Sequence, residues 1–164
     1  MNKQQLILTL GITTVLVTAA VLLYRYRQGK GYKRRLHRLF DSPDLPGSGK
    51  CMDQELLDKL HRLARITKLP IFAMINSGAR SEYWNKRVGG VANSSHKIPL
   101  CKAVDIKAPT IAIRNKLVYG AKAVGITRIG VGKTFVHVDT DHQKKQHVAW
   151  GYPKGSPPPL NPFI

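Results

Sequence analysis

The sequence predicts an α+β fold, in which a small, mainly antiparallel sheet carries helices on one side and is preceded by one N-terminal transmembrane helix. Three observations predict this fold. Apolar residues recur at helical spacing in two segments, short apolar runs alternate with them, and a long uncharged apolar stretch lies near the N-terminus. With 164 residues, the chain is long enough for one compact domain and too short for two full ones.

The uncharged stretch covers residues 6–24. At about 1.5 Å per residue, a helix of this length spans most of a hydrocarbon core of roughly 30 Å. The apolar run continues past the small residues 17–19, so we expect an uncleaved membrane anchor rather than a removed signal peptide. We assign residues 1–28 to the anchor with its basic flank. Residues 29–50, which contain Gly, Pro and Ser, are assigned to a linker.

The folded domain is predicted at residues 51–151. Asp53 suits the cap of a helix whose apolar stripe ends before Pro70. Short apolar or amphipathic segments follow, with strands expected at residues 71–75, 103–106, 128–131 and 134–138 and helices at residues 81–87 and 111–124. The last two strands read as a hairpin. The Pro-rich residues 152–164 predict an extended tail.

The chain carries 27 basic and only 9 acidic residues, for a net charge of +18. This balance predicts polyanionic surroundings, namely nucleic acid, anionic lipid or an anionic cell-wall polymer. The basic residues that follow the apolar stretch favour the C-terminal domain on the cytoplasmic side of a membrane. They also suit anionic lipid head groups or packaged nucleic acid. No motif of interleaved aromatic and basic residues is present, so we expect no sequence-specific nucleic-acid binding.

Three polar residues interrupt apolar or turn-rich segments. His96 follows Asn-Ser-Ser, Asp105 lies in Ala-Val-Asp-Ile, and His137 lies in Phe-Val-His-Val-Asp, where alternation places His137 and Asp139 on one strand face. A carboxylate on a buried strand is costly unless it is paired or binds a metal. Two imidazoles and one carboxylate form a zinc ligand set, although the spacing alone also fits hydrogen-bonded structural residues.

The short motifs around these residues come in a characteristic order: Ser-Gly-Ala-Arg-Ser at 77–81, Ser-His at 95–96, Ala-Val-Asp at 103–105 and His-Val-Asp at 137–139. In this order the chain resembles the zinc D-alanyl-D-alanine carboxypeptidase family, which belongs to the group of lysostaphin-type peptidases and hedgehog domains. The resemblance covers roughly residues 52–150.

The resemblance implies a Zn²⁺ cofactor and a role for each matching residue. It makes His96, Asp105 and His137 the zinc ligands. It also implies that Arg80 holds a substrate carboxylate or the developing oxyanion. Ser95 then bonds to a ligand or to the substrate.

One further residue matches the family, and other features depart from it. Trp150 matches a family aromatic and is expected to pack the last strand. Many relatives carry an acid or a histidine where this chain has Thr134. The leading candidate for the general base is then Asp139, ahead of Asp141 and His142, and an orienting role for Asp139 is equally open. His96 and Asp105 are nine positions apart instead of the usual seven, and Cys101 stands where a glycine is expected. Cys51 and Cys101 either form one disulfide or stay unpaired.

These features predict a membrane-anchored zinc metallopeptidase that hydrolyses peptidoglycan stem peptides or cross-links. The basic flank conflicts with this substrate, because it favours the cytoplasmic side. Two localisations resolve the conflict: the membrane of a membrane-containing virion, with the protein as a lysin, or a cell envelope to which the domain is exported. The alternative function is a catalytically inactive, basic, membrane-tethered structural or binding module of the same fold, suggested by Thr134 and the altered His96–Asp105 loop.

Overall fold

The computed structural model describes residues 18, 21–23 and 35–164. The anchor expected at residues 6–24 lies outside the described residues except at these few positions. No helix in the described part of the chain is long and apolar enough to cross a membrane. The chain divides into two units, Met1–Leu36 and His37–Ile164, and the second holds the fold and the site.

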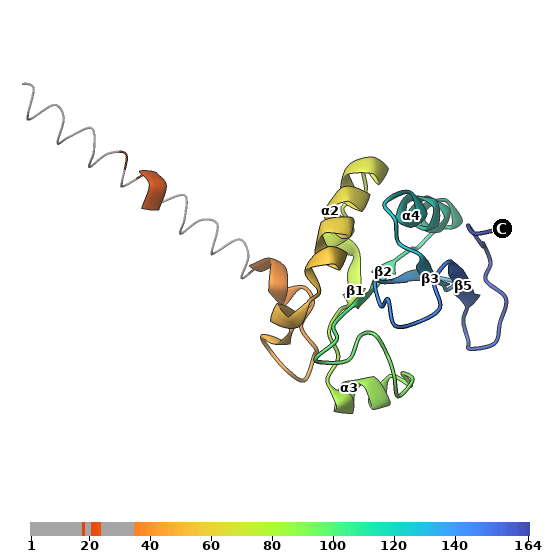
Figure 1. Ribbon diagram of the computed structural model, residues 1–164, viewed down its shortest axis with the longest axis horizontal. Coiled ribbons are helices and arrows are strands. Elements are labelled where there is room, and N and C mark those ends of the chain that lie inside the picture. The colour runs from red at the N-terminus through yellow and green to blue at the C-terminus, as the bar shows by residue number, and fades with distance from the viewer. Residues whose placement is uncertain (1–17, 19–20, 24–34) are drawn as a thin grey trace, which may run out of the picture. The chain divides into compact units, whose positions relative to one another are not determined.

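The second unit is an α+β domain built on a five-stranded sheet (Figure 1). The strands are β1 (Ile75–Ser77), β2 (Ala103–Lys107), β3 (Arg128–Val131), β4 (Phe135–Asp139) and β5 (Val148–Gly151), in the order β1-β2-β4-β3-β5. All neighbours pair antiparallel except β3 and β5, which are parallel. The expected hairpin forms between β3 and β4, and the sheet is mainly antiparallel as predicted.

Two long helices cover one side of the sheet. They are α2 (Gln54–Thr67) and α4 (Ile111–Ala123), which contact each other, and α4 also packs on β3 and β4. The short α3 (Glu82–Arg87) lies on the other side of the sheet in Figure 1, so the prediction of helices on one side holds for the long helices only. Asp53 caps α2 as expected, because its Oδ1 accepts a hydrogen bond from the Leu56 backbone N–H at 3.0 Å.

The two faces of the central strands differ in kind. Val104 and Ile106 on β2 and Val136 and Val138 on β4 are fully buried. The residues between them, Asp105 and His137, face the opposite way, because side chains alternate along a strand. The apolar face therefore forms the core with the long helices, and the polar face is left for a site.

The prediction of a strand at residues 71–75 is wrong for all but the last residue. Residues Ile71–Met74 form a 3₁₀ helix, and β1 begins only at Ile75. The backbone N–H groups of Ala73 and Met74 both donate to the Pro70 carbonyl, at 2.9 and 3.2 Å. A short apolar run fits a buried strand and a helical turn equally well, so its pattern does not separate the two.

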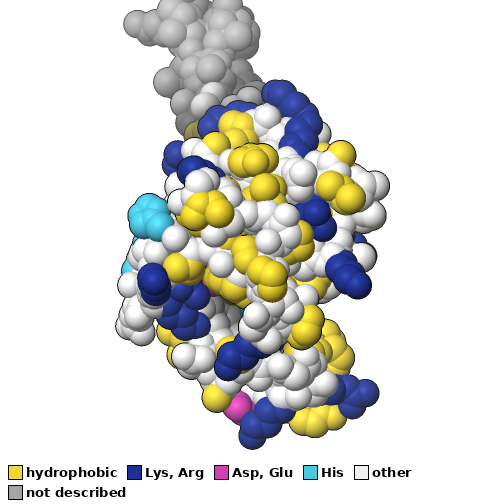
Figure 2. Space-filling view, turned by 90° about the vertical axis from the view of Figure 1, so that its right-hand side faces the viewer, with side chains coloured by type: hydrophobic (Ala, Val, Ile, Leu, Met, Phe, Trp, Pro, Cys, Tyr) yellow, Lys and Arg dark blue, Asp and Glu magenta, His cyan; other side chains and the backbone are white. Residues whose placement is uncertain are grey.

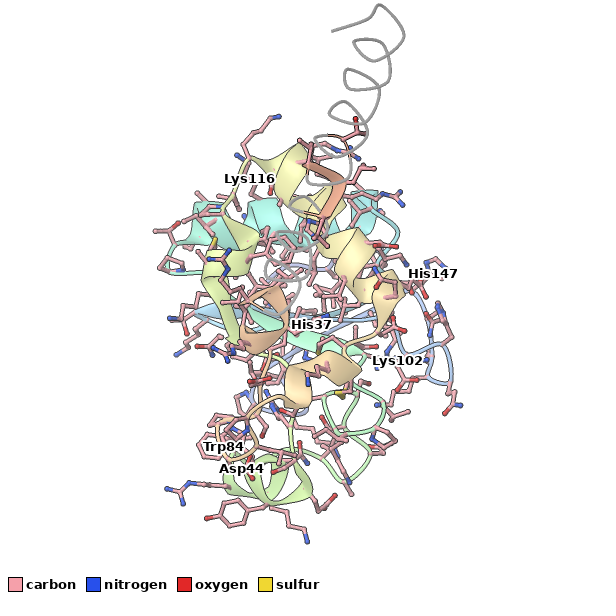
Figure 3. The ribbon with its side chains drawn as sticks, turned by 90° about the vertical axis from the view of Figure 1, so that its left-hand side faces the viewer. His37, Asp44, Trp84, Lys102, Lys116 and His147 are labelled. Carbon is pink, nitrogen blue, oxygen red and sulfur yellow. A yellow bond between two sulfur atoms is a disulfide. The ribbon has the colours of Figure 1, made fainter. Side chains whose placement is uncertain are left out.

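The structure also differs from the linker assigned to residues 29–50. Phe40 is fully buried, and its carbonyl accepts a hydrogen bond from the Ala79 N–H at 2.8 Å. Gly78 lies so close that an added Cβ would stand 2.6 Å from the Phe40 Cα. His37 and Asp44, labelled in Figure 3, belong to the same segment, and Asp44 accepts a hydrogen bond from Ser81. From His37 onward, these residues are part of the domain.

The Pro-rich tail packs back on the domain instead of staying extended. The Ser156 carbonyl accepts from the Gly151 N–H at 3.1 Å. Near the end of the chain, Lys122 on α4 donates to the Pro162 carbonyl, and Phe163 contacts the His147 ring at 5.9 Å between centroids.

Candidate metal centre

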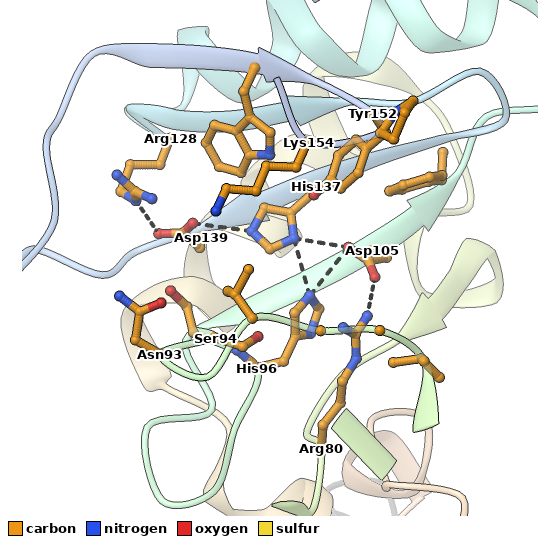
Figure 4. A pocket seen from close by; sticks show the side chains of 18 of the residues that line it. Arg80, Asn93, Ser94, His96, Asp105, Arg128, His137, Asp139, Tyr152 and Lys154 are labelled. Atoms are coloured by element: carbon orange, nitrogen blue, oxygen red, sulfur yellow. Dashed lines mark hydrogen bonds and ion pairs between the residues drawn. The ribbon is translucent and has the colours of Figure 1, made fainter. Parts of the chain in front are cut away.

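His96, Asp105 and His137 converge on the polar face of the sheet (Figure 4). Asp105 on β2 lies directly opposite His137 on β4, and His96 comes from the loop after α3. The His96 Nε2 atom lies 3.2 Å from Asp105 Oδ1 and 3.1 Å from His137 Nδ1, and the last two atoms are 2.9 Å apart. All three residues are buried, with exposed fractions of 7% or less.

The contacts of the other ring nitrogens indicate which histidine tautomers could bind a metal. The Nδ1 of His96 lies 2.7 Å from the Gly78 carbonyl, which can only accept, so Nδ1 donates and Nε2 holds a lone pair. Both ring nitrogens of His137 face carboxylates, Nε2 at 3.1 Å from Asp139 Oδ2 and Nδ1 at 2.9 Å from Asp105 Oδ1. In the neutral tautomer that donates from Nε2 to Asp139, Nδ1 holds the lone pair. Two lone pairs and a carboxylate oxygen therefore face one point. This donor set fits a divalent cation such as zinc, with both histidines oriented from behind as metal ligands usually are.

The local electrostatics shifts the pKa values of the two histidines in opposite directions. Burial lowers the pKa of His96 and outweighs the neighbouring carboxylate, which favours the neutral ligand form. Burial opposes the ionised form of Asp105, but His96 and His137 hold its pKa well below the usual range. Burial likewise opposes a charged His137, but Asp105 and Asp139 raise its pKa. The carboxylates of Asp105 and Asp139 thus favour a positive charge beside His137, which a proton or a bound cation would supply.

Arg80 holds both the aspartate and the loop of His96. Its guanidinium forms an ion pair with Asp105 Oδ2, and its Nε donates to Ser77 Oγ at 2.8 Å. Its backbone N–H donates to the His96 carbonyl at 2.8 Å. Arg80 therefore lies at the candidate metal centre with its side chain engaged by Asp105, and its role toward the substrate stays a prediction.

Ser95 lies beside the centre without touching a ligand side chain. Its hydroxyl donates to Asp141 Oδ2 at 2.9 Å and accepts from Lys144 Nζ at 2.8 Å. Lys144 also donates to the Asn93 carbonyl at 2.6 Å. These bonds tie the loop before His96 to the segment after β4, so the role they support for Ser95 is to hold the loop.

The longer loop between His96 and Asp105 closes on itself and keeps both ligands in place. The Lys102 N–H donates to the Ser95 carbonyl at 2.8 Å across its base. Cys101 has a φ of 46°, the left-handed conformation in which a glycine is favoured. Cys101 forms a disulfide with Cys51, which settles the pairing left open by the sequence and leaves no thiolate for the metal.

The site opens into a cavity of about 800 Å³. Its lining includes Trp150, Tyr152 and Lys154 from β5 and the segment after it, none of which the sequence placed at the site. The Trp150 ring lies 5.3 Å from His137 between centroids, and an added Cβ on Gly130 would stand 2.8 Å from Trp150 and Tyr152. Gly130 thus admits both rings. Alternation in Val-Ala-Trp-Gly-Tyr could have placed Trp150 and Tyr152 on one face, but β5 was not predicted.

The Tyr152 hydroxyl is held in its neutral form. Burial and the charge of Asp105 raise its pKa to about 12. At neutral pH this phenol is a hydrogen-bond donor in the cavity, and it cannot act as a base.

The buried His-Asp-His group under an open cavity in a small α+β domain is a candidate metal centre. Residues 38–139, more than half of the chain, match the family described as Peptidase M15. The chain belongs to this family of zinc-dependent metallopeptidases, which confirms the resemblance seen in its motifs. No curated protein matches the chain.

Proposed function

We propose that this protein is a membrane-anchored zinc peptidase that hydrolyses peptidoglycan stem peptides or their cross-links. One observation carries the proposal. In a chain of the Peptidase M15 family, two histidine lone pairs and a carboxylate oxygen face one point beside a cavity of about 800 Å³. That cavity has room for a short peptide segment.

Each residue of the site has its own role in the proposed hydrolysis. Zinc, when bound, supplies the Lewis acidity that activates water at neutral pH and polarises a carbonyl oxygen. His96, Asp105 and His137 are the residues that would hold it. Arg80 keeps Asp105 in place and still has N–H groups that could donate to developing negative charge.

Asp139 is better placed to orient His137 than to act as a base. It bonds to the His137 ring nitrogen that points away from the metal centre, and its Oδ1 accepts from Arg128 Nε at 2.7 Å and from the Asp141 N–H at 3.0 Å. Such a carboxylate fixes the histidine tautomer and strengthens it as a ligand. We therefore favour the orienting role over the base role.

The disulfide supports a place for the domain outside the reducing cytoplasm. Disulfides form and persist in oxidising compartments, and the Cys51–Cys101 bond lies within the peptidase domain. With residues 6–24 as anchor, the domain would then face the outer side of a cell envelope membrane or lie in the membrane of a virion. Either place reconciles the protein with its substrate, against the direction that the basic flank favours.

The high positive charge fits the same surroundings. On the face shown in Figure 2, Lys and Arg side chains are spread widely and acidic ones are scarce. A surface of this kind attracts anionic wall polymers and speeds encounter with them.

The test measures zinc content and muropeptide release with the purified full chain. We expect one zinc ion per chain and release of products from isolated peptidoglycan. His137→Ala should lose both, whereas His142→Ala, which removes an exposed histidine paired with Glu55, should keep both. Unchanged muropeptide release by His137→Ala would rule out the zinc mechanism.

A specific observation favours a second candidate, the inactive binding module. The only acids that line the cavity in the described part of the chain are Asp105 and Asp139, and both are engaged with other side chains. Thr134, in the position of the usual acid, is exposed in the β3–β4 turn. Bound zinc with no hydrolysis of any wall peptide would select this candidate.

A further inference from the structure

Four cationic side chains line the cavity, and three of them have carboxylate partners. Arg80 pairs with Asp105, Arg128 Nε lies 2.7 Å from Asp139 Oδ1, and Lys144 Nζ lies 3.3 Å from Asp141 Oδ2. The fourth is Lys154. Within the described residues it forms no hydrogen bond or ion pair.

Lys154 lies in the segment that follows β5, on the polar face of the sheet. Figure 4 shows its side chain in the cavity, on the side of His137 and Asp139. Asp139 is already bound by His137 and Arg128, so its charge is neutralised without Lys154. The lysine is therefore an unpaired cation at the mouth of the metal centre.

We propose that Lys154 binds a carboxylate of the peptide substrate in this cavity. The inference rests on the proposed function and specifies which group of the substrate is recognised. A carboxylate is the anionic group that a peptide offers, and a lysine ammonium binds it with three donors on a flexible stem. Arg80, to which the resemblance gives this role, has its Nε and one terminal nitrogen occupied by Ser77 and Asp105.

A carboxylate bound by Lys154 could belong to either of two positions in a stem peptide, and each position predicts a different cleavage. A terminal carboxylate bound beside the metal centre places the last peptide bond at the ligands, which is carboxypeptidase action. A side-chain carboxylate on the amino side of the bond would instead leave the carboxyl end free to continue into a cross-link.

The experiment compares three peptides by calorimetry with the metal-free full chain. The first is an acylated D-Ala-D-Ala peptide, the second is its C-terminal amide, and the third is that amide with an acidic residue on the amino side. We expect the wild-type chain to bind the free carboxylate roughly five- to tenfold more tightly than the plain amide. Lys154→Gln should bind the two about equally.

Lys116→Gln is the matched control, because it removes the same charge from an exposed position on α4 (Figure 3). It should keep the wild-type preference. If the third peptide binds as tightly as the first and loses this in Lys154→Gln, Lys154 recognises a side-chain carboxylate, and the proposal stands with that source.

Two results would overturn the inference: a wild-type chain that does not distinguish the peptides or binds none of them, and a preference that survives in Lys154→Gln. The failure of the proposed function looks different. In that case the zinc-loaded chain hydrolyses no peptide, while a Lys154-dependent preference in binding is still measurable.

Discussion

The two faces of the central sheet are built from the same strands but have different roles, one in the core and the other in the candidate site. On one face, Val104, Ile106, Val136 and Val138 are fully buried under the long helices. On the other, Asp105 and His137 are paired across β2 and β4, are almost as deeply buried and belong to a connected set of polar contacts. A single alternating pattern thus supplies the core and positions two candidate metal ligands.

The difference between the faces lies in how burial is compensated. The apolar face gains free energy from area removed from water. The polar face bears a desolvation cost that is offset by specific partners, namely Gly78 and Asp139 behind the two histidines and Arg80 behind Asp105. We therefore expect variants on the apolar face to change stability and variants on the polar face to change metal binding.

The sharpest contrast comes from two neighbours on β2 that point to opposite faces. Asp105→Ala should abolish stoichiometric zinc binding and peptide hydrolysis, because it removes one of three ligands. Ile106→Ala should lower the free energy of unfolding by about 2–5 kcal/mol and keep one zinc ion per chain, because it leaves a cavity in the core. Metal analysis and urea denaturation measure the two effects. A folded Ile106→Ala chain that had lost its zinc would break the division between the faces.

The next largest effect is expected from the disulfide, which fastens the loop between two ligands. Cys51 and Cys101 are 50 positions apart, and closing such a loop stabilises the folded state by about 4 kcal/mol through the unfolded chain. The double variant Cys51→Ala/Cys101→Ala should lose about that much free energy of unfolding. Denaturation of the wild-type chain with and without reductant is the control. No difference between the oxidised and reduced wild-type chain would show that the bond does not form in solution.

Asp139→Asn tests the support behind His137. Loss of the carboxylate should weaken zinc binding about 10- to 100-fold, because the histidine is no longer held by a charged acceptor. Competition with a chelator measures the affinity. At saturating zinc we expect the rate of hydrolysis to be largely retained, and a rate that stays low would make Asp139 the general base.

The smallest expected effect lies at the edge of the polar face, at Asp141. Ser95 and Lys144 outweigh the effect of burial and lower the pKa of Asp141, so its ionised form stabilises the folded state. Asp141→Asn should cost about 1.5 kcal/mol at neutral pH. Because the folded pKa lies below the ordinary value of 3.8, this difference should be constant above that pH and shrink as the pH falls through the lowered pKa. Urea denaturation at pH 7 and pH 3 checks this, and equal stability at pH 7 would contradict it.

Much of this architecture could be predicted from local patterns. The stripe and cap of α2, the turn between β3 and β4 and the shared face of His137 and Asp139 are short-range features that sequence alone shows. The three candidate metal ligands were predicted from ordered motifs, not from spacing.

What could not be predicted depends on contacts between distant segments. The burial of Phe40 against Gly78 is decided by tertiary packing, so the segment from His37 looked like a linker. The Cys51–Cys101 pairing has no local signal. Lys154 belongs to the site only because β5 pairs with β3. The apolar run of β5 is short, and the sequence pattern did not predict a strand there.

The proposed function requires that His96, Asp105 and His137 bind one zinc ion. Anomalous diffraction from crystals of the full chain grown with zinc, recorded on both sides of the zinc absorption edge, tests it most directly. We predict a single peak about 2.0–2.2 Å from His96 Nε2, Asp105 Oδ1 and His137 Nδ1. A map with no peak at these atoms, or with zinc bound only elsewhere, would contradict the account.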